Sequence, residues 1–163
     1  MELLELPFSE TEVHAALMDM NGDKALGSDG FTVAFWQSCR DFVKEEILDM
    51  FKEFHEQSSF VRSLNNMFLV LLSKKKGAED LGDYRPIGLL RGLYKLLAKV
   101  LANRLKKVIG KVVSPDQNAF VTGRQILDAS LIANEVIDSW LKRGEKGLIC
   151  KLDIEKEYDN INW

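Results

Sequence analysis

The chain has 163 residues, of which 46% are hydrophobic and 29% charged, a balance typical of a single folded domain and not of a disordered protein. No apolar run approaches the roughly 18–20 residues that span a bilayer, and the acidic first residues lack the basic start of a secretory signal. The two cysteines, Cys39 and Cys150, have no Cys or His near them at metal spacing. This argues against a disulfide framework and a zinc module, and fits a reducing compartment.

The net charge of −3 hides a separation of charge along the chain. Residues 1–60 carry 4 basic and 13 acidic side chains, whereas residues 61–124 carry 13 basic and 4 acidic ones. From Tyr84 to Pro115 there are eight basic residues and no acidic residue. So basic a segment indicates contact with a polyphosphate. The alternative from charge alone is a solvated helix face balanced by the acidic first third.

The first half of the chain predicts two helices and a strand. Ser9 and Glu12 have capping-box spacing, which predicts a short helix to about Met20, and a turn-rich loop follows over residues 21–30. Residues 67–72 form a short apolar run typical of a strand, and Arg85 is expected to be extended because a proline follows it. Between the loop over residues 21–30 and the strand over residues 67–72, a long amphipathic helix is predicted from apolar residues at helical spacing: Phe35, Cys39, Phe42, Val43, Ile47, Met50, Phe51 and Phe54.

The second half predicts two further helices and one strand. A helix is expected from about 93 to 109, another start signal lies at 114–117, and a third long helix spans 126 to about 141. Residues 148–154 alternate as a strand that places Asp153 opposite the apolar side chains. Long helices before two separate strands indicate an α+β fold, with no internal boundary. The helix over 93–109 is expected to turn Leu96, Leu97, Val100, Leu101, Leu105 and Val108 inward, with Lys95, Lys99, Arg104, Lys106 and Lys107 on its other faces.

The acidic residues from Asp153 onward favour a magnesium site. Glu155, Glu157 and Asp159 follow at alternate positions, and clustered carboxylates suit Mg²⁺ together with substrate phosphates. A strand end with a solvated acidic turn is the alternative. A calcium loop is excluded because Tyr158 occupies the position that requires glycine. The glycines of residues 22–27 lack the Lys-Ser/Thr of a nucleotide P-loop.

Five blocks carry a resemblance to a known family, in the order KALGSDGF (24–31), LLSKKKGAEDLGDYRPIGLL (71–90), YKLLAKVLANRLKKVI (94–109), SPDQNAFVTGRQILDASLIANE (114–135) and KLDIEKEYDNINW (151–163). Together they resemble the reverse transcriptase domain of non-LTR retrotransposons of the LINE type, particularly those abundant in plants. The resemblance implies a right-hand polymerase fold, mostly helical with a few strands. On it, residues 1–145 or so would be the fingers with flanking helices, and residues 146–163 or so the start of a truncated palm.

The resemblance also implies roles for individual residues. Asp153 would be the first catalytic aspartate and would bind Mg²⁺, and Tyr158 would lie under the sugar of the incoming nucleotide. Arg85 and Lys74 would contact its triphosphate, while Arg124 and Gln125 match a block near template and nucleotide. The implied partners are an RNA template, a DNA primer and dNTPs, with no membrane, in the nucleus or cytoplasm. The residues expected to contact nucleic acid along the basic helix are Lys95, Lys99, Arg104 and Lys106.

Two departures from the family pattern bear on activity. Glu157 replaces a small residue next to the nucleotide, where a carboxylate opposes binding of a triphosphate. The chain also has no adjacent pair of aspartates, which the family carries on a later hairpin and which a two-metal site needs. The chain alone is therefore expected to be inactive, as a fragment of an RNA-directed DNA polymerase. The alternative is a degenerate, non-catalytic remnant that still binds nucleic acid.

Overall fold

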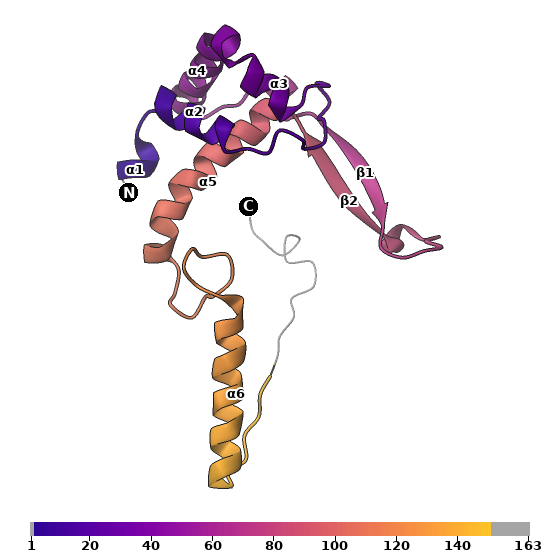
Figure 1. Ribbon diagram of the computed structural model, residues 1–163, viewed down its shortest axis with the longest axis vertical. Helices are drawn as coiled ribbons and strands as arrows, with labels where there is room; N and C mark the ends of the chain where they lie inside the picture. The colour runs from indigo at the N-terminus through magenta and orange to yellow at the C-terminus, as the bar shows by residue number, and fades with distance from the viewer. Residues whose placement is uncertain (1, 151–163) are drawn as a thin grey trace. The chain divides into compact units, whose positions relative to one another are not determined.

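The computed structural model describes residues 2–150 of the chain (Figure 1). These residues fold as helices and one two-stranded antiparallel sheet, and they divide into two compact units between Ile109 and Gly110. This agrees with the predicted α+β class. None of the helices in this part of the chain is long and apolar enough to cross a lipid bilayer. The helices are α1 (Glu2–Glu5), α2 (Glu10–Met18), α3 (Val33–Ser38), α4 (Arg40–Gln57), α5 (Gly92–Val112) and α6 (Ile126–Arg143), with short 3₁₀ turns at Arg62–Asn65 and Leu81–Asp83.

The core of the first unit lies where α2, α3 and α4 meet α5, as Figure 1 shows. The predicted helix after Ser9 is confirmed as α2, and the Ser9 hydroxyl accepts a hydrogen bond from the Glu12 backbone N–H at 3.2 Å. The predicted basic helix is confirmed as α5. The core is apolar and draws on all four helices: Val13, Ala16, Leu17, Val33, Ile47, Phe51, Leu96, Leu97 and Val100 are buried.

The single long helix predicted over Phe35 to Phe54 is wrong in one respect, because the chain breaks it into α3 and α4 at Cys39. The backbone of Cys39 has ψ 7°, far from the value near −42° of a regular helix, so the two parts do not share one face. Thr32 caps α3 by accepting from the Phe35 N–H at 3.1 Å. Phe42, predicted to lie on the apolar stripe, is 89% exposed, because two and a half helical turns separate it from the buried Phe51 and place it on the opposite face of α4.

The sheet is a hairpin of β1 (Met67–Ser73) and β2 (Tyr84–Leu90), with Met67 opposite Leu90 and Ser73 opposite Tyr84. The first strand is confirmed, and Arg85 is extended as predicted. The rest of β2 was not predicted, because Pro86 and Gly88 interrupt an apolar alternation. Pro86 is tolerated since a strand in a two-stranded sheet has one unpaired edge.

Two predictions about the faces of α5 are wrong. Leu105 was expected inside but is 51% exposed, and Arg104 was expected on an outer face but is 3% exposed. The reason is that the first unit provides a carboxylate and three carbonyl groups for the Arg104 guanidinium. A buried charge is tolerated when it is paired and hydrogen-bonded in this way.

In the second unit, the predicted third helix is confirmed as α6. It begins with a capping box between Gln125 and Asp128, and it ends at Gly144, whose φ of 65° suits glycine. The helix start predicted at 114–117 is wrong: the Ser114 hydroxyl accepts from the Asp116 N–H, which closes a turn instead. Residues 148–150 have no strand pairing, and the rest of the predicted strand lies outside the described residues.

Candidate functional site

The hairpin carries the two residues predicted to contact a triphosphate. Arg85 lies opposite Leu72 on β2, and Lys74 directly follows β1, so both lie near the same end of the sheet. The Lys74 ammonium donates to the Gly82 carbonyl at 2.8 Å. Arg85 is exposed and its side chain makes no hydrogen bond or ion pair within residues 2–150, so its guanidinium is available to an anion.

A second lysine of the hairpin loop, Lys75, is paired with a carboxylate of the same loop. Lys75 forms an ion pair with Asp83 at 2.8 Å, and this hydrogen bond holds the pKa of the Asp83 carboxyl below its ordinary value. The Lys74 backbone N–H also donates to the Asp83 carbonyl at 2.7 Å, which closes the loop. The loop is therefore ordered by its own polar groups.

The loop over residues 21–31 is bound to the junction between β2 and α5. The Arg91 Nε donates to the Ser28 hydroxyl at 2.8 Å, and the Gly92 N–H donates to the Asp29 carboxylate at 3.3 Å. Gly27 lies against the same junction, since a Cβ there would be 2.4 Å from the Leu90 carbonyl oxygen. This packing role was missed, although Ser28 and Asp29 are typical of turns that bind backbone groups.

The predicted nucleic-acid residues of α5 differ in their surroundings. Lys95 is half-buried and donates to the Ala25 carbonyl at 2.8 Å. Lys99 pairs with Asp19 at 2.7 Å, and this hydrogen bond lowers the pKa of the Asp19 carboxyl. Lys106 is exposed, as is Lys107 beside it, and neither makes an ion pair within the described residues. Two exposed lysines of α5 without an ion pair in the described residues, Lys106 and Lys107, thus lie in its C-terminal half.

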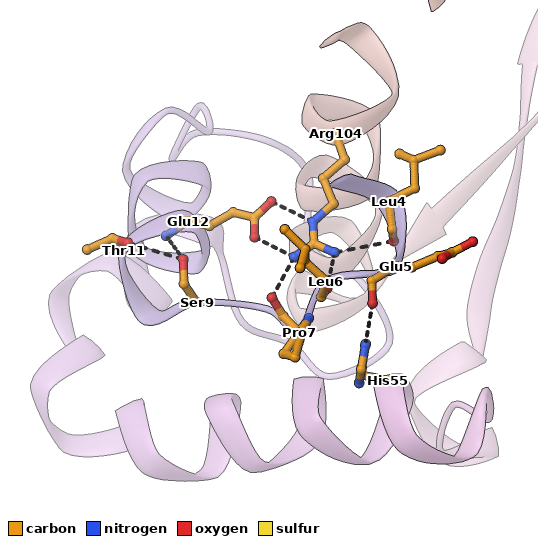
Figure 2. A network of polar contacts seen from close by, with 9 residues as sticks. All are labelled: Leu4, Glu5, Leu6, Pro7, Ser9, Thr11, Glu12, His55 and Arg104. Carbon is orange, nitrogen blue, oxygen red and sulfur yellow. Dashed lines mark hydrogen bonds and ion pairs between the residues drawn. The ribbon is translucent and has the colours of Figure 1, made fainter. Parts of the chain in front are cut away.

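Arg104 lies inside the first unit at the centre of a polar network (Figure 2). Its guanidinium donates to both carboxylate oxygens of Glu12, at 2.8 and 2.7 Å, and this bond holds the pKa of the Glu12 carboxyl below its ordinary value. It also lies 4.1 Å from the centre of the Phe8 ring. Figure 2 shows its remaining bonds, to the carbonyls of Leu4, Leu6 and Pro7. Arg104 is therefore not accessible to a phosphate.

In the second unit, Arg124 and Gln125 are neighbours with local partners. The Arg124 guanidinium donates to carbonyls of the preceding loop, among them Gln117 at 2.8 Å and Ser114. Gln125 caps α6. Arg124 therefore binds the segment between α5 and α6, and Gln125 ends that segment by capping α6.

Asp153 and Tyr158, the predicted catalytic and nucleotide-binding residues, lie outside the described residues. Within residues 2–150 there is no group of three or more His, Cys, Asp or Glu side chains that could hold a metal ion. The fit of Mg²⁺ therefore depends on the chemistry of the sequence from Asp153 onward. Asp153 supplies one suitable carboxylate, which does not complete a two-metal site.

The comparison of sequences decides the family. Residues 73–163, just over half of the chain, match the family described as reverse transcriptase (RNA-dependent DNA polymerase). The chain belongs to the reverse transcriptase family. The match begins at the last residue of β1 and includes β2, α5 and α6. Reverse transcriptases generally use divalent metal ions and act on a nucleic acid template and primer with dNTPs.

Two relatives indicate the kind of reverse transcriptase. The chain is 31% identical over 161 residues to the transposon TX1 uncharacterized 149 kDa protein of Xenopus laevis, and 29% identical over 143 residues to the retrovirus-related Pol polyprotein from type-1 retrotransposable element R1 of Bradysia coprophila. These alignments cover 99% and 86% of the chain. The resemblance to a reverse transcriptase fragment of a non-LTR retrotransposon is confirmed. The chain spans only 12% and 14% of the lengths of these relatives.

Proposed function

We propose that the chain forms the fingers and the first palm strand of a right-hand polymerase, in a LINE-type element of the kind abundant in plants. The complete domain would copy RNA into DNA: a primer 3′-hydroxyl attacks the α-phosphate of a dNTP, and pyrophosphate leaves. Asp153 would be one ligand of the Mg²⁺ that supplies charge stabilisation in that reaction.

The observation that carries this proposal is the match to the family over residues 73–163 together with the exposed basic half of α5. Helix α5 contains no acidic residue, and Lys106 and Lys107 have no carboxylate partner in the described part of the chain. Unpaired lysines on one helix suit contact with nucleic acid phosphates. Lys95 and Lys99 remain proposed contacts, although each already binds an oxygen of the protein.

The nucleotide would be bound by the hairpin and by residues of the later blocks. Arg85 is exposed and can bond two phosphate oxygens at once, with Lys74 near the same end of the sheet. Tyr158 is proposed to contact the sugar. Arg124 and Gln125 are proposed to act near the nucleotide and template, in addition to the local bonds described above.

A second candidate function is that of a degenerate remnant that binds nucleic acid without catalysis. It is favoured by Glu157, which adds negative charge where the family binds a triphosphate. Both candidates share binding of nucleic acid. They differ in whether a longer protein that includes this chain and a downstream aspartate hairpin incorporates nucleotides.

Binding is tested by fluorescence anisotropy with a labelled RNA–DNA hybrid over a range of salt concentrations. The double variant Lys106→Gln/Lys107→Gln should weaken binding and reduce the slope of log K against log salt by about 1–2. Lys52→Gln, an exposed lysine on the acidic helix α4, is the matched control and should leave the slope unchanged. Absence of binding at low salt, or an equal effect of Lys52→Gln, would contradict the proposal.

A further inference from the structure

Phe31 and Phe35 form a stacked aromatic pair on the surface of the first unit. Their ring centroids are 4.3 Å apart with an interplanar angle of 22°, and the two residues are 43% and 38% exposed. Both rings also meet Trp36 edge-on, at 5.7 and 5.5 Å. Two large rings are thus held in contact with each other while a substantial part of their surface faces solvent.

The pair is fixed by polar contacts on each side. The Phe31 N–H donates to the Asp29 carboxylate at 3.3 Å, and the same carboxylate accepts from the Gly92 N–H at the start of α5. The Phe35 N–H donates to the Thr32 hydroxyl. Trp36 lies directly against Gly92, where a Cβ would be 2.3 Å from the indole nitrogen. The rings therefore do not need to be ordered when a ligand arrives, which lowers the entropic cost of binding.

The surroundings of the pair are suited to an anionic ligand. The loop that carries Phe31 is held by Arg91 and Lys95, both in the segment from Tyr84 to Pro115 that has no acidic residue, while the loop's own Asp29 carboxylate is hydrogen-bonded to the Phe31 and Gly92 N–H groups. Another exposed phenylalanine of the same unit, Phe42, lies instead close in sequence to Glu45 and Glu46 of α4, which make no ion pair within the described residues, whereas Arg40 and Lys44 are paired with Asp41 and Glu10. Charge therefore favours a polyanion at the first pair and disfavours it at Phe42.

We propose that Phe31 and Phe35 are a stacking platform for an unpaired base of a single-stranded nucleic acid. A flat aromatic surface beside positive charge is the arrangement that binds single strands, because every base has a face that stacks and every nucleotide a phosphate. This inference rests on the proposed binding of nucleic acid. It adds a contact to bases, which the lysines of α5 do not make. This contact does not depend on the nucleotide sequence, because any base can stack.

The test compares two labelled oligonucleotides of equal length, oligo(U) and its abasic counterpart, which carry the same phosphates. The wild-type chain should bind oligo(U) at least about fivefold more tightly, in line with the gain from stacking one base. The variant Phe31→Leu/Phe35→Leu should lose most of this preference, and Phe31→Tyr/Phe35→Tyr should keep it because the rings remain. Phe42→Leu is the matched control and should bind both oligonucleotides as the wild type does.

The outcomes separate this inference from the proposed function. Lys106→Gln/Lys107→Gln should weaken the binding of both oligonucleotides equally, which tests the phosphate contacts alone. Equal affinity of the wild type for oligo(U) and the abasic strand would overturn the platform while leaving the proposed function standing. If neither oligonucleotide binds, both the platform and the proposed function are overturned. If the leucine variant instead changes the sedimentation coefficient and keeps the preference for bases, the pair is a protein contact and the platform is wrong.

Discussion

The Arg104 guanidinium bonds both carboxylate oxygens of Glu12, joining α5 to α2 across 92 positions of sequence. The side chain of Arg104 is 4% exposed and that of Glu12 is 23% exposed, so the pair is mostly removed from water. In such surroundings a charge that loses its partner is costly. The pair therefore controls how firmly the N-terminal helices are attached to α5.

Arg104→Met should lower the free energy of unfolding by about 3–5 kcal/mol, because the Glu12 carboxylate is left without its partner. Urea unfolding followed by circular dichroism measures this. Arg104→Lys should recover only part of the loss, since an ammonium cannot bond both carboxylate oxygens and the carbonyls at once. Lys106→Met, at an exposed position on the same helix, is the control and should change stability by no more than about 0.5 kcal/mol.

The same pair predicts how stability depends on pH. The hydrogen bond from Arg104 lowers the pKa of Glu12 in the folded protein, so the unfolded chain binds this proton more readily. The contribution of Glu12 is therefore complete above the ordinary carboxyl pKa of about 4.3 and is lost as pH falls through the lowered value. The difference in unfolding free energy between wild type and Glu12→Gln should shrink from pH 6 to pH 3. If the difference between wild type and Glu12→Gln stays constant from pH 6 to pH 3, the Glu12–Arg104 pair does not cause the pH dependence of stability.

Gly27→Ala should loosen the loop over residues 21–31. A Cβ at this position would lie 2.4 Å from the Leu90 carbonyl oxygen and 2.6 Å from the Arg91 Cα, and both are backbone atoms that cannot move away cheaply. We expect a loss of about 1–3 kcal/mol, seen as a lower melting temperature. Gly82→Ala is the control, because nothing lies within 4 Å of a Cβ there. Equal melting temperatures for the two variants would show that the loop does not pack as described.

Strand β1 should promote association of the isolated chain. All of its residues are exposed, including Phe68 at 56% and Leu69 at 63%, and within residues 2–150 each strand of the two-stranded sheet has an unpaired edge. Exposed apolar strand edges pair with other chains. Sedimentation velocity should show association that rises with concentration and that Leu69→Lys reduces. Phe42→Lys, an equally large change on a helix, should have no such effect.

The 163-residue chain should not extend a primed RNA template with Mg²⁺ and dNTPs, because it has no adjacent aspartate pair to complete a two-metal site. A primer-extension assay checks this. In a longer protein with the downstream hairpin, extension should occur and Asp153→Asn should abolish it by removing a charged ligand. Extension by the 163-residue chain that disappears with Asp153→Asn would mean that the metal site is completed in another way.

The sequence predicted elements where the pattern is local and missed features that depend on distant partners. The apolar spacing of α5 and α6 was enough to predict both helices, because a helix buries one regular stripe. Arg104 could not be recognised as buried: in a run of basic residues it looks like its neighbours, and Glu12 lies in another helix. Strand β2 was missed for the same reason, since only pairing with β1 compensates for Pro86 and Gly88. The roles of Asp153 and Tyr158 rest on the family resemblance and stay predictions.

The Arg104 network also bears on which positions of the N-terminal segment can vary in evolution. Arg104 bonds the main-chain carbonyls of Leu4, Leu6 and Pro7, while Leu4 and Leu6 themselves are 36% and 51% exposed. Every residue type has a carbonyl oxygen, so many side chains can replace these leucines without loss of the bonds. Glu12 and Arg104 have no such freedom. A copy of the element that accumulates mutations should therefore tolerate changes at residues 4 and 6 long after a change at residue 12 or 104 has detached the segment.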